Sequence, residues 1–190
     1  MAVKLLITDF DGTLVDTFEA NYRAYAEAFD AVGRGLTRER YRECFGFRFD
    51  RFMEAMGVEE DAVRAEIRKI KGECYPSYFG HLVVNRPLLE MLRAFRRSGG
   101  KTAIASTARE VNLLNALRHI GADGDFDLVL AGESVRRGKP DPEIYLTVLD
   151  RLGVGADEAL VFEDSPVGFA AAESAGIRYI PVNEEFYSDI

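Results

Sequence analysis

The chain has 190 residues, of which 47% are hydrophobic and 29% are charged, a composition that predicts a globular fold and excludes a disordered chain. With 24 basic and 32 acidic residues its net charge is −8, so we expect neither nucleic acid nor a membrane surface as a partner. The apolar stretch at residues 3–7 is too short for a signal sequence or a membrane span, which favours a cytoplasmic protein. Cys44 and Cys74 form no CxxC motif and indicate free thiols.

Five short apolar runs, continuous rather than alternating, predict strands that are covered on both faces of a sheet. These runs are residues 3–7, 102–105, 128–130, 159–162 and 179–182. Helical periods separate the later runs, at residues 111–117, 145–152 and 166–175. Because strands and helices alternate, we expect an α/β fold with a doubly wound, five-stranded parallel sheet, which is a Rossmann-like core.

The first two runs are separated by residues 8–101, which is far more than one crossover connection needs. Apolar residues at helical spacing predict two long helices in this segment, and glycines separate two shorter ones. The predicted helices cover residues 18–32, 38–44, 50–56 and 63–74, and residues 86–97 form the crossover helix of the sheet itself. We therefore predict an all-helical cap at residues 16–81, inserted into a core made of residues 1–15 and 82–190.

Polar residues follow four of the predicted strands, and the carboxyl ends of parallel strands are where such sheets bind ligands. The segments are Asp-Phe-Asp-Gly-Thr at 9–13, Ser-Thr at 106–107, Gly-Lys-Pro at 138–140 and Glu-Asp-Ser at 163–165. Their acids are Asp9, Asp11, Glu163 and Asp164. Four neighbouring carboxylates repel one another unless a cation lies among them, and an oxygen-only set favours Mg²⁺.

A magnesium site with a nearby lysine and hydroxyl group suggests phosphoryl chemistry, because Mg²⁺ usually completes its coordination with phosphate oxygens. A carboxylate can attack phosphorus and carry the group as an aspartyl-phosphate. Asp11, two residues along a tight turn, can protonate the leaving oxygen and later deprotonate water. Gly12 allows the turn and a close approach of the backbone to the ligand.

Each segment taken alone also has a purely structural interpretation. Residues 9–13 fit an acidic turn, and Ser106 with Thr107 fits a helix cap. Asp141 and Pro142 fit the start of a helix, as does the segment 163–166. The order of the four segments and their position at strand ends favour the functional interpretation.

In these motifs the chain resembles the haloacid dehalogenase-like superfamily, in its phosphatase and phosphomutase branch with a helical cap. The resemblance implies that Asp9 is the nucleophile and Asp11 the general acid and base. It implies phosphate binding by Ser106, Thr107 and Lys139. It implies Mg²⁺ held by Asp9, Asp164 and the backbone carbonyl of Asp11, with Glu163 assisting directly or through water, and a cap hinged near residues 15–17 and 82–87.

The chain departs from several members of that superfamily. Its dehalogenases lack an acid at the position of Asp11, so dehalogenation is disfavoured. β-Phosphoglucomutases share the Glu-Asp-Ser motif but carry a histidine where this chain has Asn21, which cannot relay protons. They also carry an arginine where this chain has Phe49, with Arg48 beside it. We therefore expect a phosphatase rather than a mutase.

The substrate is expected to be a small phosphorylated metabolite, such as a sugar phosphate or phosphoglycolate, because a capped pocket suits a small ligand. The candidate cap residues that contact it are Asn21, Phe47, Arg48 and Arg51, and packing or solvation explains each of them as well. We expect a monomer. A noncatalytic binding protein with the same fold is the alternative from another class, and the intact acids argue against it.

Overall fold

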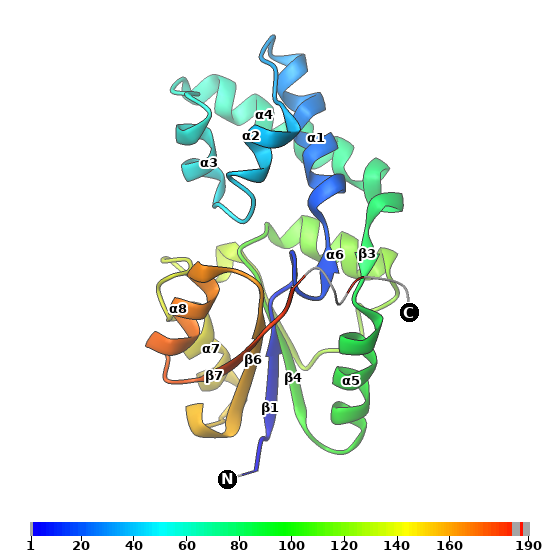
Figure 1. The fold of residues 1–190 in the computed structure, drawn as a ribbon, viewed down its shortest axis with the longest axis vertical. Coiled ribbons are helices and arrows are strands. Elements are labelled where there is room, and N and C mark those ends of the chain that lie inside the picture. Colours follow the sequence, from blue (N-terminus) through cyan, green and yellow to red (C-terminus); the bar gives the residue numbers. More distant parts are fainter. Residues whose placement is uncertain (1, 184–186, 188–190) are drawn as a thin grey trace. The chain divides into compact units, whose positions relative to one another are not determined.

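The computed structural model describes residues 2–183 and 187, and it divides into two compact units. One unit consists of Met1–Asp16 and Val83–Ile190, and the other is the inserted segment Thr17–Leu82. Figure 1 labels most of the helices and strands of both. No helix in the part of the chain that the structure describes is long and apolar enough to cross a membrane.

The larger unit is built on a five-stranded parallel sheet, which confirms the predicted α/β fold. Its strand order is β5-β4-β1-β6-β7, so the first strand of the chain lies in the middle (Figure 1). The strands are β1 (Leu5–Thr8), β4 (Lys101–Ala105), β5 (Leu128–Leu130), β6 (Ala159–Glu163) and β7 (Arg178–Pro181). Thr8 pairs with Ile104 and Phe162, so the three central strands end within one residue of the same level.

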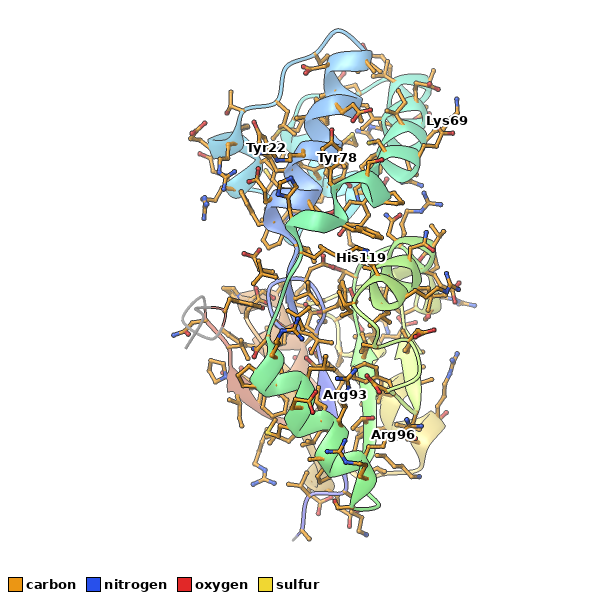
Figure 2. The ribbon with its side chains drawn as sticks, turned by 90° about the vertical axis from the view of Figure 1, so that its right-hand side faces the viewer. Tyr22, Lys69, Tyr78, Arg93, Arg96 and His119 are labelled. Atoms are coloured by element: carbon orange, nitrogen blue, oxygen red, sulfur yellow. The ribbon has the colours of Figure 1, made fainter. Side chains whose placement is uncertain are left out.

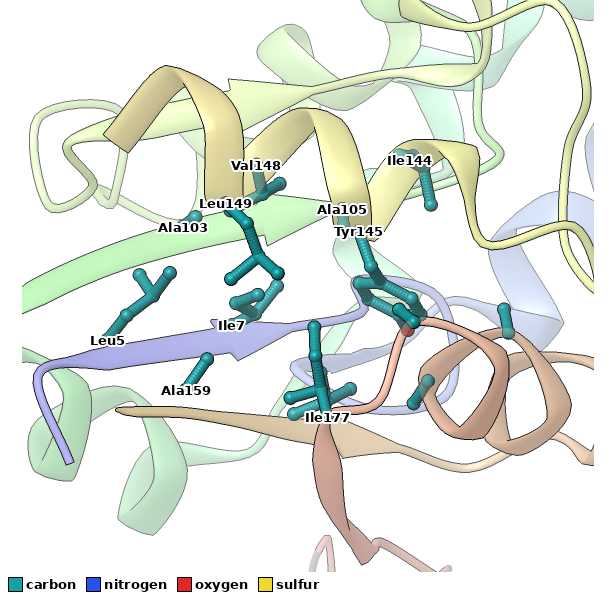
Figure 3. Close-up of a cluster of buried hydrophobic side chains, with 14 of the residues drawn as sticks. Leu5, Ile7, Ala103, Ala105, Ile144, Tyr145, Val148, Leu149, Ala159 and Ile177 are labelled. Atoms are coloured by element: carbon teal, nitrogen blue, oxygen red, sulfur yellow. The ribbon is translucent and has the colours of Figure 1, made fainter. Parts of the chain in front are cut away.

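Helices follow the strands of this sheet as the apolar periods predict. They are α5 (Arg86–Arg97), α6 (Glu110–His119), α7 (Glu143–Leu152) and α8 (Pro166–Ser174), with short 3₁₀ turns at Gly132–Ser134 and Ala156–Glu158. Leu5 and Ile7 of β1 pack with Tyr145, Val148 and Leu149 of α7 in one buried cluster (Figure 3). On α5, labelled Arg93 and Arg96 form ion pairs with Asp125 and Asp127 in the segment before β5 (Figure 2).

A second, two-stranded sheet was not predicted from the sequence. It consists of β2 (Val15–Asp16) and β3 (Val83–Val84), which pair antiparallel with Val15 opposite Val84 and Asp16 opposite Val83. Strands of two residues are too short to show an apolar period. The pairing brings together the two points at which the inserted segment leaves and rejoins the core unit.

The inserted unit is helical throughout. It contains α1 (Phe18–Ala31), α2 (Arg38–Arg42), α3 (Phe49–Ala55), α4 (Asp61–Cys74) and a 3₁₀ helix, η1 (Tyr75–His81). Its core is rich in aromatic rings, with Tyr41 contacting Phe18, Tyr25 and Phe52. The aromatic residues of α1, which are Phe18, Tyr22, Tyr25 and Phe29, therefore form part of this core. Both cysteines are free thiols, Cys44 buried and Cys74 half-buried.

Candidate active site

The turn after β1 carries the first motif in a compact loop. Val15 donates its backbone N–H to the carbonyl of Phe10 at 2.9 Å, and Gly12 donates to the carbonyl of Val15 at 2.8 Å. Gly12 has a φ of +86°, a conformation that residues with a side chain rarely adopt. The buried side chain of Asn85 donates to the carbonyl of Thr13 at 3.2 Å, so the start of α5 supports this loop.

A buried lysine links the first motif to the last. Lys139 Nζ donates to Asp9 Oδ1 at 2.7 Å and to Glu163 Oε1 at 2.5 Å. Only 3% of the Lys139 side chain is exposed, against 10% for Asp9 and 1% for Glu163. One ammonium group therefore bridges two carboxylates away from water, and the three motifs meet at one place.

Burial and charge act in opposite directions on this pair. Burial raises the pKa of Asp9, and Lys139 opposes that rise while Glu163 and Asp164 add to it. Burial is the largest single effect and would lower the pKa of Lys139, but Asp9, Tyr145 and Glu163 around it together more than offset burial and raise the pKa. We conclude that Lys139 stays protonated, which is the state that attracts an anion.

Glu163 is held from several sides. Its Oε2 accepts from the backbone N–H of Asp164 at 2.9 Å, and from the N–H and hydroxyl of Ser165, each at 3.0 Å. Its Oε1 accepts from Tyr145 Oη at 3.2 Å as well as from Lys139. A Cβ on Gly168 would lie 1.9 Å from the Glu163 carboxyl carbon, so glycine leaves the space that this carboxylate fills.

Asp164 lies against the first motif. Its Oδ1 accepts from Thr13 Oγ1 at 2.8 Å, and a Cβ on Gly12 would lie only 2.2 Å from its Oδ2. Burial, together with the charge of Glu163, raises the pKa of Asp164 to about 6. The absence of a side chain at Gly12 therefore serves both the turn and the position of Asp164.

The remaining core candidates lie at the ends of β1 and β4. Ser106 is buried, and its Oγ lies 3.5 Å from Asp11 Oδ2 while accepting the backbone N–H of Ala108 at 3.1 Å. The carbonyl of Thr107 would be 2.5 Å from a Cβ on Gly132. Arg109 is the N-cap residue of α6, so Ser106 and Thr107 do not cap that helix.

The structural interpretations of two motifs hold alongside the chemical ones. Asp141 Oδ1 accepts the N–H of Glu143 at 3.0 Å at the start of α7. Ser165 is the N-cap residue of α8 and accepts the N–H of Gly168 at 3.1 Å, with a proline in the first turn. These helix starts hold the segments that carry Lys139 and Asp164 in place.

The acids fit a hard divalent cation. Asp9, Glu163 and Asp164 each offer a carboxylate oxygen, and these oxygens lie within 4.8 Å of one another. Among the residues that the structure describes, none donates a hydrogen bond to Asp9 Oδ2 or Asp164 Oδ2, which leaves both atoms for a cation or ligand. Such an oxygen-only set is the chemistry that Mg²⁺ prefers. The Asp11 side chain is not in this group, and its backbone carbonyl as a ligand stays a prediction.

The four cap candidates belong to the inserted unit. Asn21 is buried and donates its amide to Thr17 Oγ1 at 3.0 Å. The guanidinium carbon of Arg51 lies 3.9 Å from the ring centroid of Phe47, and Arg48 is the N-cap residue of α3. Their part in substrate binding stays a prediction.

Two residues near the acids were missed by the sequence analysis as site residues. Tyr145 lies on the apolar face of α7, where its spacing predicts only core packing. Tyr187 has a buried hydroxyl without a hydrogen-bond partner in the described part of the chain, and burial and the charge of Asp164 raise its pKa. No sequence pattern singles out either residue.

The fold and this site together define an α/β protein with a carboxylate-rich centre at the carboxyl ends of its central strands. Residues 6–182 match the model of the haloacid dehalogenase-like hydrolases, so the chain belongs to this family of enzymes. The match confirms the resemblance that the four motifs indicated.

Curated and solved relatives support the same assignment. A phosphorylated carbohydrates phosphatase of Thermotoga maritima is 33% identical over 94% of this chain and 84% of that protein. A variant of CbbY from Rhodobacter sphaeroides, solved with xylulose 1,5-bisphosphate, has a TM-score of 0.87 at 28% identity, over 97% of this chain and 88% of that one. A β-phosphoglucomutase from Clostridium difficile has a TM-score of 0.81 at 22% identity, over 97% and 86% of the two chains, which shows a shared fold alone.

Proposed function

We propose that this chain is a Mg²⁺-dependent phosphatase that hydrolyses a small phosphorylated carbohydrate through an aspartyl-phosphate on Asp9. The observation that carries the proposal is the contact of Asp9 Oδ1 with the buried ammonium group of Lys139 at 2.7 Å. This contact fixes the Asp9 carboxylate directly after β1, where it can attack phosphorus. It also places a permanent positive charge where the transferred phosphoryl group must lie.

In the first step a carboxylate oxygen of Asp9 forms a bond to phosphorus, and the bond from phosphorus to the alcohol oxygen of the substrate breaks. Asp11 gives its proton to that oxygen as the alcohol leaves. In the second step Asp11 takes a proton from water, which attacks the phosphorus and frees Asp9 and inorganic phosphate. The hydroxyls of Ser106 and Thr107 and the ammonium of Lys139 would hold the phosphoryl oxygens.

Mg²⁺ held by Asp9, Asp164 and the carbonyl of Asp11, with Glu163 assisting directly or through water, would supply further positive charge for those oxygens when bound. The 4.8 Å spread of the three side-chain oxygens supports this assignment. Each of these acids carries its ligand atom on a segment that a helix start or a backbone hydrogen bond holds in place.

The substrate class rests on the relatives. The Thermotoga maritima protein is named for phosphorylated carbohydrates, and the CbbY structure contains a sugar bisphosphate. A sugar phosphate is therefore the class we propose, with Asn21, Phe47, Arg48 and Arg51 as candidate contacts. The mutase reaction is disfavoured because Asn21 and Phe49 replace the histidine and arginine that such mutases carry.

The test is release of inorganic phosphate from p-nitrophenyl phosphate and from a panel of sugar phosphates, with Mg²⁺ and with a chelator. We expect Mg²⁺-dependent release, and a fall of about a thousandfold or more in Asp9→Asn, because the amide is a poor nucleophile of nearly equal volume. Mass spectrometry of acid-quenched enzyme should find the phosphoryl group on Asp9.

Two outcomes would contradict the proposal. Residual turnover of Asp9→Asn within about tenfold of the unmodified enzyme would remove Asp9 as the nucleophile. Conversion of β-glucose 1-phosphate to its isomer without release of phosphate would identify a mutase instead.

A further inference from the structure

Tyr145 joins the hydrophobic core to the charged site. Its side chain is fully buried, and its ring packs in the cluster between α7 and the sheet (Figure 3). At the end of the ring, Oη donates to Glu163 Oε1 at 3.2 Å. The residue is therefore fixed at its ring by packing and at its hydroxyl by a carboxylate of the site.

Lys139 lies close to both Glu163 and the ring of Tyr145. Its Nζ donates to the same oxygen, Glu163 Oε1, at 2.5 Å, and lies 5.1 Å from the centroid of the Tyr145 ring. A cation at this distance from an aromatic face is attracted to it. The ammonium group is thus in contact with Glu163 and Asp9 and lies near the face of the Tyr145 ring.

A lysine ammonium stands on a flexible four-carbon chain, so its position depends on its neighbours. Glu163 is suited to hold it, because four other hydrogen bonds fix the carboxylate: one from Tyr145 and three from the segment 164–165. Of these donors, only Tyr145 comes from the packed apolar face of α7. Removing its hydroxyl leaves Oε1 of Glu163 with Lys139 alone.

We propose that Tyr145 is a positioning residue, which fixes Glu163 Oε1 and thereby holds Lys139 Nζ against the nucleophilic Asp9. The inference rests on the proposed function for its kinetic consequence. Tyr145 touches neither phosphorus nor the leaving group in this scheme, and it acts through the two charged side chains. We therefore expect the Tyr145 hydroxyl to contribute to turnover more than to substrate affinity, because the position of Lys139 matters most as charge develops on the phosphoryl group.

The test compares Tyr145→Phe with Tyr179→Phe in the full chain. Both substitutions remove a tyrosine hydroxyl that donates to a glutamate, since Tyr179 Oη donates to Glu173 at 2.9 Å in an exposed hydrogen bond. With p-nitrophenyl phosphate and saturating Mg²⁺ we expect kcat to fall about tenfold in Tyr145→Phe, with KM within about twofold. Tyr179→Phe should keep both constants.

A second measurement does not depend on activity. In protein labelled with ¹⁵N-lysine, the side-chain resonance of Lys139 should shift in Tyr145→Phe and stay unchanged in Tyr179→Phe. Thermal melting of both variants checks that they are folded at the assay temperature. We expect both to be folded, because phenylalanine keeps the aromatic ring of tyrosine.

The outcomes separate the two proposals. If the unmodified enzyme releases no phosphate from any ester, the proposed function fails, and the Lys139 resonance still decides whether Tyr145 positions it. If the enzyme is active and Tyr145→Phe keeps its kcat within about twofold, the positioning role is wrong. An unshifted Lys139 resonance in Tyr145→Phe would also overturn it.

Discussion

Replacing Gly12 by alanine tests the geometry of the site through a single methyl group. Gly12 has a φ of +86°, so alanine there costs about 1–2 kcal/mol of folding free energy from backbone strain alone. The new Cβ would also lie 2.2 Å from Asp164 Oδ2, so the carboxylate must turn away. It then loses its hydrogen bond from Thr13, and a bond to a charged group contributes about 1.5–3 kcal/mol.

The two contributions sum to a loss of about 2.5–5 kcal/mol, and a matched variant separates them. Gly99 has a φ of +94°, and a Cβ built there meets nothing within 4 Å. Gly99→Ala should therefore lose only the strain of about 1–2 kcal/mol. Only Gly12→Ala should also lose turnover and affinity for Mg²⁺, because only it moves Asp164.

The assay is urea unfolding of both variants without metal, followed by p-nitrophenyl phosphate turnover across a Mg²⁺ titration. We expect Gly12→Ala to lose about a hundredfold or more in turnover, since a displaced ligand or reacting group has effects of this size. Equal unfolding free energies for the two variants, with full turnover in Gly12→Ala, would refute the placement of Asp164 beside the turn.

Two other substitutions probe the same cluster. Burial raises the pKa of Asp164 from an ordinary 3.8 to about 6, so the folded protein holds this proton to a higher pH than the unfolded chain does. Its contribution to metal-free stability is therefore complete below pH 3.8 and is lost as the pH rises through about 6. Asp164→Asn removes this dependence and should be the more stable protein at pH 7, and a pH-independent difference in unfolding free energy between the two proteins would contradict the assignment. Gly168→Ala places a Cβ 1.9 Å from the Glu163 carboxyl carbon and should lower stability by about 1–3 kcal/mol through overpacking. Its kcat should fall too, and unchanged melting and turnover would show that Glu163 can move without effect.

The sheet and its helices could be predicted because each has a strong local pattern. The strand at Leu128–Leu130 and the helix Arg86–Arg97 have the same bounds in the prediction and in the structure. The helix bounds follow from local signals, since Asn85 caps its start and Gly99 and Gly100 follow its end. The pairing of β2 with β3 depends on contacts between residues far apart in the chain, and a strand of two residues has no local pattern that predicts it.

The predicted site residues came together for a general reason, since polar residues that follow parallel strands share one edge of the sheet. Asp9, Lys139 and Glu163 are joined in this way. Tyr145 could not be identified, because a core position and a position whose hydroxyl reaches the site have the same helical spacing. The hydrogen bond from Thr13 to Asp164 could not be predicted either, because Asp164 lies 151 residues further along the chain.

The short ladder between β2 and β3 has an evolutionary consequence. Because Asp16 and Val83 are paired neighbours, the 66 residues from Thr17 to Leu82 begin and end at adjacent positions of the larger unit. A tight hairpin, or a segment of quite different size and shape, can be spliced between these two positions while the sheet keeps its strand order. Under the proposed function, which assigns the substrate contacts to the inserted unit, specificity can therefore evolve separately from the residues that cleave the bond.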